Sequence, residues 1–315
     1  MSFGPRQYFL AGLLLLPLLA AAFDWSFLGT LLLLLLLLLM RWASVFREMG
    51  RRDKEPTLVL ETISMSHFVE KVRWCMDRLG IDYNEQACSG VLGVMFTGRT
   101  VPRLKFRTGI VESSIGHSPE ILRFLWGEHA ATHPEAAAFL APDEDRLALE
   151  KRFDRYGVDL QVWVYYHILD DRDLTLRLWG AEDPQVPAWQ RAIMRPLFPV
   201  TAWFLRRTFS IDDDHYARAV RHVDEVLAEA EALLGQDDRV SLLGGNSLNY
   251  VDITFAGISG LWLRPDNYGG GMADDCMVPL EALPEAMQAD IERWKTEYPV
   301  ATAFIERLYE KERLQ

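Results

Sequence analysis

The chain has 315 residues, half of them apolar and a quarter charged, with a formal net charge of −12 at pH 7. This length and composition exclude a mainly disordered chain and allow one large or two ordinary domains. Residues 1–56 carry a net charge of +2, which leaves −14 for the other 259 residues. So acidic a body repels phosphate backbones, which argues against nucleic-acid binding. Three scattered cysteines exclude a disulfide scaffold and favour a reducing compartment.

Two apolar stretches open the chain, at residues 8–23 and 26–42, and the second contains nine consecutive leucines. A helix of 16 residues spans about 24 Å, less than the ~30 Å hydrocarbon core of a bilayer. Our first interpretation is a membrane-spanning helical hairpin that turns at residues 23–26. The alternative is a cleaved signal peptide that ends near residues 20–22, which would leave the second stretch as a single anchor.

Five basic residues lie at the end of the second apolar stretch and directly after it, and such residues stay on the cytoplasmic side of a membrane. We therefore expect an anchor at residues 1–45, a basic linker at 46–56, and the rest of the chain in the cytoplasm at the inner or plasma membrane. The basic residues are Arg41, Arg47, Arg51, Arg52 and Lys54.

A strand, a helix and a second strand are predicted after the linker. Residues 57–63 are apolar and β-branched, and a turn follows at 64–66. Apolar residues then recur at spacings of three and four over residues 68–79, with Gly80 closing the pattern. Residues 81–87 are a plausible second strand, so the segment predicts a right-handed, parallel β-α-β unit.

Ser66 lies at the start of the predicted helix. Helix N-termini have unpaired N–H groups and the positive end of the dipole, so they stabilise an anion such as a thiolate. The Ser66 hydroxyl would add a donor beside that anion. The alternative is that Ser66 only caps the helix.

A β-hairpin is predicted at residues 104–114, with its turn at 107–109 and a helix after it. The pair Val101-Pro102 stands directly before the hairpin. A proline opens a strand only in special arrangements, and a cis peptide bond is one of them.

Three signals stand in the order found in soluble glutathione S-transferases: the turn and helix start at residues 66–74, the Val101-Pro102 pair, and Glu112-Ser113. On these residues the chain resembles that family over about residues 57–312. The resemblance implies an α/β thioredoxin-like domain at 57–130 that binds glutathione.

An all-α domain at 143–315 would follow the α/β domain, and one or two transmembrane helices would precede both. The resemblance also implies that glutathione is a co-substrate and that the protein is a homodimer. We expect no metal.

The roles of individual residues are also implied by the resemblance. Ser66 matches the family's catalytic Ser or Cys and would stabilise the glutathione thiolate. Val101 matches the residue whose backbone pairs with the cysteinyl part of glutathione, before a cis-proline at Pro102. Glu112 and Ser113 match the pair that binds the γ-glutamyl amine and carboxylate.

Two departures from the family pattern limit what is implied. Ser66 and His67 replace the cysteine and proline of a disulfide-exchange site, so we do not expect that chemistry. Residues 88–99 are Gly-rich and poorly patterned, and the basic residue for the glycine end of glutathione stays open between Arg99 and Arg103.

The C-terminal half has helical periodicity almost throughout. Asn249 and Asp252 resemble the family's capping motif at the start of a core helix, so their expected role is structural. His129 and His133 have metal-ligand spacing, but Pro134 follows at once, and we interpret them as a helix end rather than a metal site. The predicted helices cover residues 146–169, 188–208, 214–234, 251–263 and 284–313, with a break near Pro299.

Together these features predict a membrane-anchored, glutathione S-transferase-like protein that transfers glutathione to an apolar electrophile near the lipid bilayer. A different class, a non-catalytic scaffold or ligand-binding protein with the same fold, stays open, and an occluded glutathione site would favour it. A glutathione-dependent isomerase or dehalogenase is a third option.

Overall fold

The computed structural model describes residues 5–22, 25–50, 56–89, 100–108, 111–235 and 239–314. The chain forms two compact units. The first comprises Met1–Val59 and Lys105–Ser114, and the second comprises Leu60–Leu104 and Ile115–Gln315. The second unit therefore contains residues on both sides of the domain boundary that the sequence suggests at 130–143.

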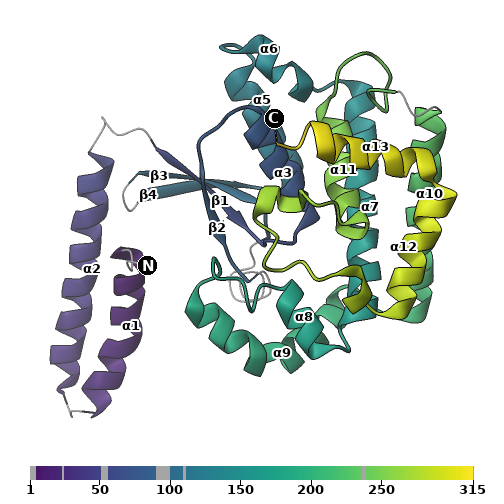
Figure 1. The fold of residues 1–315 in the computed structure, drawn as a ribbon. Helices are drawn as coiled ribbons and strands as arrows, with labels where there is room; N and C mark the ends of the chain where they lie inside the picture. Colours follow the sequence, from purple (N-terminus) through teal and green to yellow (C-terminus); the bar gives the residue numbers. More distant parts are fainter. Residues whose placement is uncertain are drawn as a thin grey trace. The chain divides into compact units, whose positions relative to one another are not determined.

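Two helices of the first unit, α1 (Pro5–Ala22) and α2 (Phe27–Met49), form a hairpin (Figure 1). The Ser26 hydroxyl caps α2 by accepting a 3.1 Å hydrogen bond from the Gly29 N–H. A Cβ atom at Gly12 would lie 3.0 Å from the Leu37 side chain. Glycine therefore allows the two helices to approach closely.

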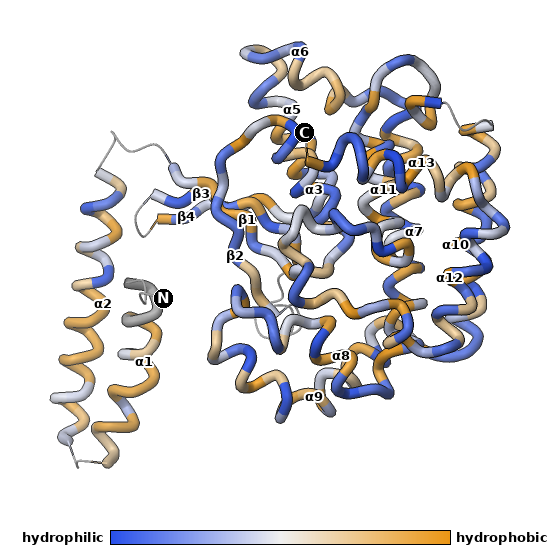
Figure 2. Tube along the Cα trace, in the orientation of Figure 1, coloured by the Kyte–Doolittle hydropathy of each residue, from blue (hydrophilic) through white to orange (hydrophobic). Residues whose placement is uncertain are grey.

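By length and composition alone, α2 qualifies as a membrane span, whereas the apolar part of α1, Phe9–Ala22, is shorter. At 1.5 Å per residue the 23 residues of α2 reach about 35 Å, more than the ~30 Å hydrocarbon core. The helix is longer than the apolar stretch because it continues past residue 42 into the basic segment. Figure 2 shows the hydrophobic character of both helices.

The four strands form one sheet in the order β2-β1-β3-β4. The neighbours β1 and β2 are joined through a helix, α3 (His67–Arg78), as the β-α-β pattern predicts. The neighbours β3 and β4 are separated by two residues, so they run antiparallel. The strands are β1 (Thr57–Thr62), β2 (Asn84–Ala87), β3 (Arg103–Thr108) and β4 (Val111–Gly116).

The helices of the second unit match the sequence periodicity closely, and the break near Pro299 is the start of α13 (Figure 1). The short helix α8 was not predicted. The helices are α3 (His67–Arg78), α5 (Ser118–His129), α6 (Pro134–Ala137), α7 (Glu144–Ile168), α8 (Arg172–Leu178), α9 (Ala188–Thr208), α10 (Asp213–Leu234), α11 (Tyr250–Leu263), α12 (Glu285–Glu297) and α13 (Pro299–Lys311).

Helix α11 is the centre of the second unit, with all but one of its residues buried. It packs against α3, α7 and α13. The contact with α3 is close because Gly257 has no side chain: a Cβ atom there would lie 3.2 Å from the Lys71 backbone nitrogen. Such a helix, apolar on all sides, is stable only inside a core.

Buried ion pairs join α3 to distant parts of the chain. Lys71, fully buried, pairs with Glu150 at 2.8 Å and with Asp154 at 3.0 Å on α7. Glu70, also fully buried, binds Arg313 Nε at 2.6 Å and Arg73 Nη1 at 3.0 Å. Because a buried charge is tolerated only with a partner, α3 depends on residues far along the sequence.

Candidate functional site

Ser66 is the residue before the first turn of α3, and its hydroxyl makes no capping hydrogen bond to the helix. Its backbone N–H donates to Ile63 O at 2.9 Å, and its carbonyl accepts from the Val69 and Glu70 N–H groups at 3.0 Å. The residue is partly exposed. The Ser66 hydroxyl therefore does not cap α3, contrary to the capping interpretation.

The turn before Ser66 is held from two directions. The Ser64 hydroxyl donates a 2.6 Å hydrogen bond to the buried carboxylate of Asp183, in the segment between α8 and α9. The Tyr268 hydroxyl donates to Met65 O at 3.1 Å. Both contacts lie within the second unit, so this turn presents Ser66 on a fixed backbone.

His67, next to Ser66, is buried and neutral at pH 7. Burial lowers the pKa of His67 to about 4, with its contact to the Gly157 backbone acting in the opposite direction. Its ring lies 4.3 Å from the Phe68 ring, centre to centre. A thiolate beside Ser66 would therefore gain nothing from a His67 charge and would depend on the hydroxyl and the helix N-terminus.

The cysteines offer no alternative nucleophile. All three are buried and free of disulfides. Burial raises the pKa of the Cys75 and Cys276 thiols to about 12, so both stay protonated at neutral pH.

The Val101–Pro102 peptide bond is cis, the form that the resemblance implies. Pro102 is buried and Val101 is partly exposed, directly before β3. Arg103 follows, and its Nε atom is buried without a hydrogen-bond partner among the residues described. Most of the segment 88–99, with Arg99, lies outside the described residues.

Glu112 and Ser113 lie within β4, in the first unit, and not at the start of the following helix. The Glu112 carboxylate pairs with Arg107 Nη2 at 3.0 Å and with Lys105 Nζ at 3.9 Å. Ser113 is exposed. Ser66 and Val101 belong to the second unit.

The start of α5 holds two residues that the sequence analysis passed over, His117 and Ser118. The strand continues to Gly116, so His117 is the residue before the helix, and Ser118 is buried in its first turn. His117 has φ 63° and ψ 130°, a conformation that costs a non-glycine residue about 1–3 kcal/mol and is found most often at functional sites. No sequence pattern marks such a backbone in advance.

Asn249 and Asp252 form a reciprocal capping pair at the start of α11. The Asn249 side chain accepts a 2.8 Å hydrogen bond from the Val251 N–H, and Asp252 accepts from the Asn249 and Leu242 N–H groups at 2.9 and 2.8 Å. Burial raises the pKa of Asp252 to about 6, although these N–H groups lower it. The pair is buried, so its role is to fix the central helix.

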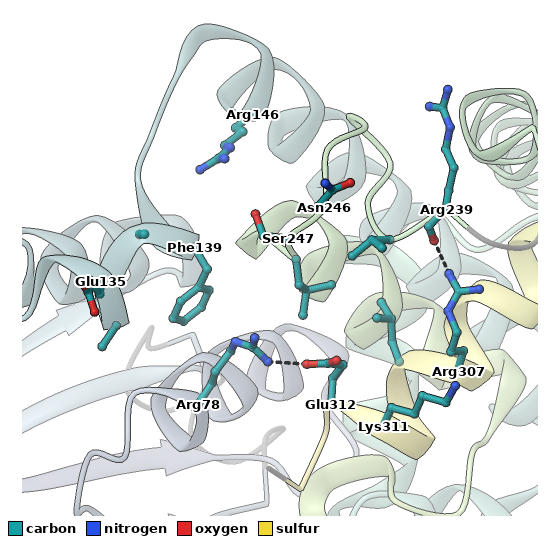
Figure 3. Close-up of a pocket in the computed structure, with 15 residues that line it drawn as sticks. Arg78, Glu135, Phe139, Arg146, Arg239, Asn246, Ser247, Arg307, Lys311 and Glu312 are labelled. Carbon is teal, nitrogen blue, oxygen red and sulfur yellow. Dashed lines mark hydrogen bonds and ion pairs between the residues drawn. The ribbon is translucent and has the colours of Figure 1, made fainter.

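A cleft of about 1100 Å³ lies at the C-terminal end of α3 (Figure 3). Arg78 and Glu312 form a 2.7 Å ion pair in its wall, and Phe139 lines it as well. Because the 12 residues of α3 span about 18 Å, this cleft lies at the other end of the helix from Ser66. None of the predicted site residues lines it.

A metal site is not found within the described part of the chain: no three His, Cys, Asp or Glu side chains there are grouped to hold an ion. His129 and His133 lie with ring centres 6.3 Å apart. Their Nδ1 atoms are already used, by Leu125 O at 2.9 Å and by the Thr132 hydroxyl at 2.9 Å.

Comparisons with known proteins give distant structural likenesses. No family model matches the sequence, and no curated protein does. Similar solved structures include a glutathione S-transferase from Methylobacterium radiotolerans in complex with glutathione sulfonate, with 17% identity, a TM-score of 0.48, and coverage of 82% of this chain and 92% of that one. Ure2p in complex with glutathione has 14% identity, a TM-score of 0.45 and coverage of 83% and 98%.

A third similar structure is the beta-etherase LigF from Sphingobium sp., with 15% identity, a TM-score of 0.44 and coverage of 82% of this chain and 97% of that one. At these identities and scores, no residue of the chain receives a role from the likeness.

Proposed function

We propose that the protein is a glutathione-dependent transferase, similar to glutathione S-transferases, that is attached to a membrane by α1 and α2. The observation that carries the catalytic part is the Ser66 hydroxyl, which lies at the N-terminus of α3 and makes no capping hydrogen bond. A hydroxyl donor and a helix N-terminus favour a bound thiolate over the thiol. The thiolate sulfur would then form a bond to an apolar electrophile and displace its leaving group, such as the halide of an activated aryl halide.

The other end of glutathione carries an amine and a carboxylate, and the chain has two places for them. The resemblance points to Glu112 and Ser113. The Glu112 carboxylate already has Arg107 as a partner, so binding an amine there would need a rearrangement. His117 and Ser118, at the start of α5 and in the same unit as Ser66, offer helix N–H groups to a carboxylate instead.

Calorimetry with glutathione on the full chain in detergent micelles separates these possibilities. We expect Glu112→Gln or Ser118→Ala, whichever residue contacts the ligand, to weaken binding by about 1–3 kcal/mol. Ser247→Ala, an exposed serine in the distant cleft, is the matched control and should leave binding unchanged. If millimolar glutathione gives no heat with the unaltered chain, the transferase proposal is wrong and the scaffold alternative takes its place.

The role of Ser66 is tested by the pH dependence of turnover with an activated aryl halide. Ser66→Ala removes one hydrogen-bond donor to the thiolate. The apparent pKa of bound glutathione should therefore rise by about one unit, which corresponds to a loss of about 1.36 kcal/mol of thiolate stabilisation. Glutathione binding should be largely kept. An unchanged pH profile would assign Ser66 a structural role and leave isomerase or dehalogenase chemistry without its activating group.

A further inference from the structure

Helix α9 is apolar on both of its faces. Its inner face packs on a core cluster through Met194, Phe198 and Ala202. Its outer face holds large apolar side chains as well: Trp189, Val200, Trp203 and Phe204 are 58%, 56%, 61% and 45% exposed. A surface helix normally turns polar residues outward, so this outer face is unpartnered in the chain as described.

These side chains lie on one side of α9. Trp189, Val200 and Trp203 share a single helix face, with Phe204 beside them. Pro196 lies between 189 and 200 on this exposed stripe, and Arg207 ends it. Among the residues described, the exposed Trp and Phe side chains outside α1, α2 and their connection all lie on α9. Within the described part of the chain, exposed Trp and Phe side chains outside the α1–α2 hairpin are therefore confined to α9.

All charged residues of α9 are basic. It contains four arginines and no acidic residue, in a chain whose net charge is −12. Two of the arginines pair with acids near α8, Arg195 with Asp173 at 3.0 Å and Arg206 with Asp170 at 2.7 Å. Of the other two, Arg191 is partly buried, with its Nε atom buried, whereas Arg207 is exposed on the stripe.

From this surface we infer that α9 is a membrane-binding helix that lies in the headgroup region of a bilayer containing anionic lipids. Trp, Phe and Val would enter the boundary between headgroups and acyl chains, and Arg207 on the same face would bind a lipid phosphate. Charge argues against a second copy docked through its own α9, because two helices that carry arginines and no acidic residue would face each other. The other described surfaces of a second copy offer only isolated exposed large apolar side chains, and no exposed Trp or Phe outside α1, α2 and their connection. The inference rests on the proposed membrane attachment in one respect: the anchor keeps α9 at a high local concentration of lipid.

The test uses the full chain in nanodiscs, with one fluorescent label on an introduced cysteine; the three natural cysteines are buried. Val200→Cys places the label on the outer face of α9. Val158→Cys, which is also exposed but lies on α7, is the matched control. Iodide in the buffer and brominated acyl chains quench the label from the water and from the lipid side, respectively.

In nanodiscs with anionic lipid we expect the label at position 200 to be quenched by brominated lipid and protected from iodide, and the label at 158 to show the reverse. Arg207→Gln should lower the ratio of protected to accessible label by about fivefold, which corresponds to about 1 kcal/mol for a basic residue near an anionic surface. High salt should act in the same direction.

Three outcomes overturn the inference. Equal iodide quenching at positions 200 and 158 would show that α9 faces water. Protection that needs no bilayer lipid but grows with protein concentration would assign the face to a second copy. Protection unaffected by lipid charge or by Arg207→Gln would contradict the anionic-lipid part. A chain that does not co-float with vesicles at all would contradict both this inference and the proposed anchor in α1 and α2, whereas a chain that co-floats but keeps the label at 200 in water would contradict this inference alone.

Discussion

Replacing Arg313 by methionine tests whether the buried charge of α3 depends on a partner 243 residues away. The Glu70 carboxylate binds Arg313 Nε at 2.6 Å and Nη2 at 3.3 Å, and Arg73 Nη1 at 3.0 Å. Burial alone would raise the pKa of Glu70, but the charges of Arg313 and Arg73 bring it below its ordinary value. Methionine keeps most of the volume of the arginine and removes one of these two cations.

The expected loss in the free energy of unfolding is about 3 kcal/mol, at the low end of the 3–5 kcal/mol for breaking a buried pair, because Arg73 stays in place. Arg78→Met is the matched control. This variant breaks the 2.7 Å ion pair between Arg78 and Glu312, which also joins α3 to the C-terminal end of the chain. The side chains of this pair, however, are 28% and 30% exposed. Exposed pairs contribute about 0–1 kcal/mol.

Urea unfolding of the full chain in detergent micelles, followed by tryptophan fluorescence, measures both variants. The Arg313 guanidinium lies 5.5 Å from the centre of the Trp74 ring, so the signal includes a local reporter. Adding Glu70→Gln to Arg313→Met should restore at least about 1 kcal/mol, because the uncompensated charge is then gone. Equal losses in Arg313→Met and Arg78→Met would refute the reasoning from burial.

Two further variants test the surroundings of Ser66. In Gly157→Ala the new Cβ would lie 2.8 Å from the Phe68 ring and 3.1 Å from His67 Nε2, so we expect a loss of about 1–3 kcal/mol and reduced glutathione turnover. Gly127 has open space around it, so Gly127→Ala should stabilise the fold by up to about 1 kcal/mol. Equal changes of stability in the two variants would contradict the packing described around Gly157. His67→Gln should flatten the pH dependence of stability: with a pKa of about 4 in the folded state and 6.5 unfolded, the unfolded chain binds more protons between these values. The unaltered protein should therefore lose about 2.5 kcal/mol more than the variant on going from pH 7.5 to pH 4.5, and parallel pH curves would show that His67 is not buried neutral.

Features encoded over short distances could be predicted from the sequence. The periodicity of apolar residues located most helices, including 188–208, and the spacing of Asn249 and Asp252 located the start of α11. The hairpin of α1 and α2 followed from the break between two apolar stretches.

Features that depend on long-range contacts or on backbone geometry could not. The partner of Glu70 is 243 residues away, and nothing near Arg313 marks it as buried. Strand β4 ends at Gly116, two residues past the predicted end of the hairpin at 114, and the backbone conformation of His117 before α5 has no signature in the sequence. The outward apolar face of α9 was hidden because periodicity shows that a helix has an apolar side but not which sides are covered.

The buried ion pairs of α3 also have a consequence for biosynthesis. Helix α3 leaves the ribosome early, but Lys71 meets Glu150 and Glu70 meets Arg313 only after those residues have been made. Until then its charged side chains stay hydrated, since burying them alone costs several kcal/mol each. We therefore expect the β-α-β segment to remain unconsolidated during translation, and the second unit to fold as a whole once residue 313 has emerged.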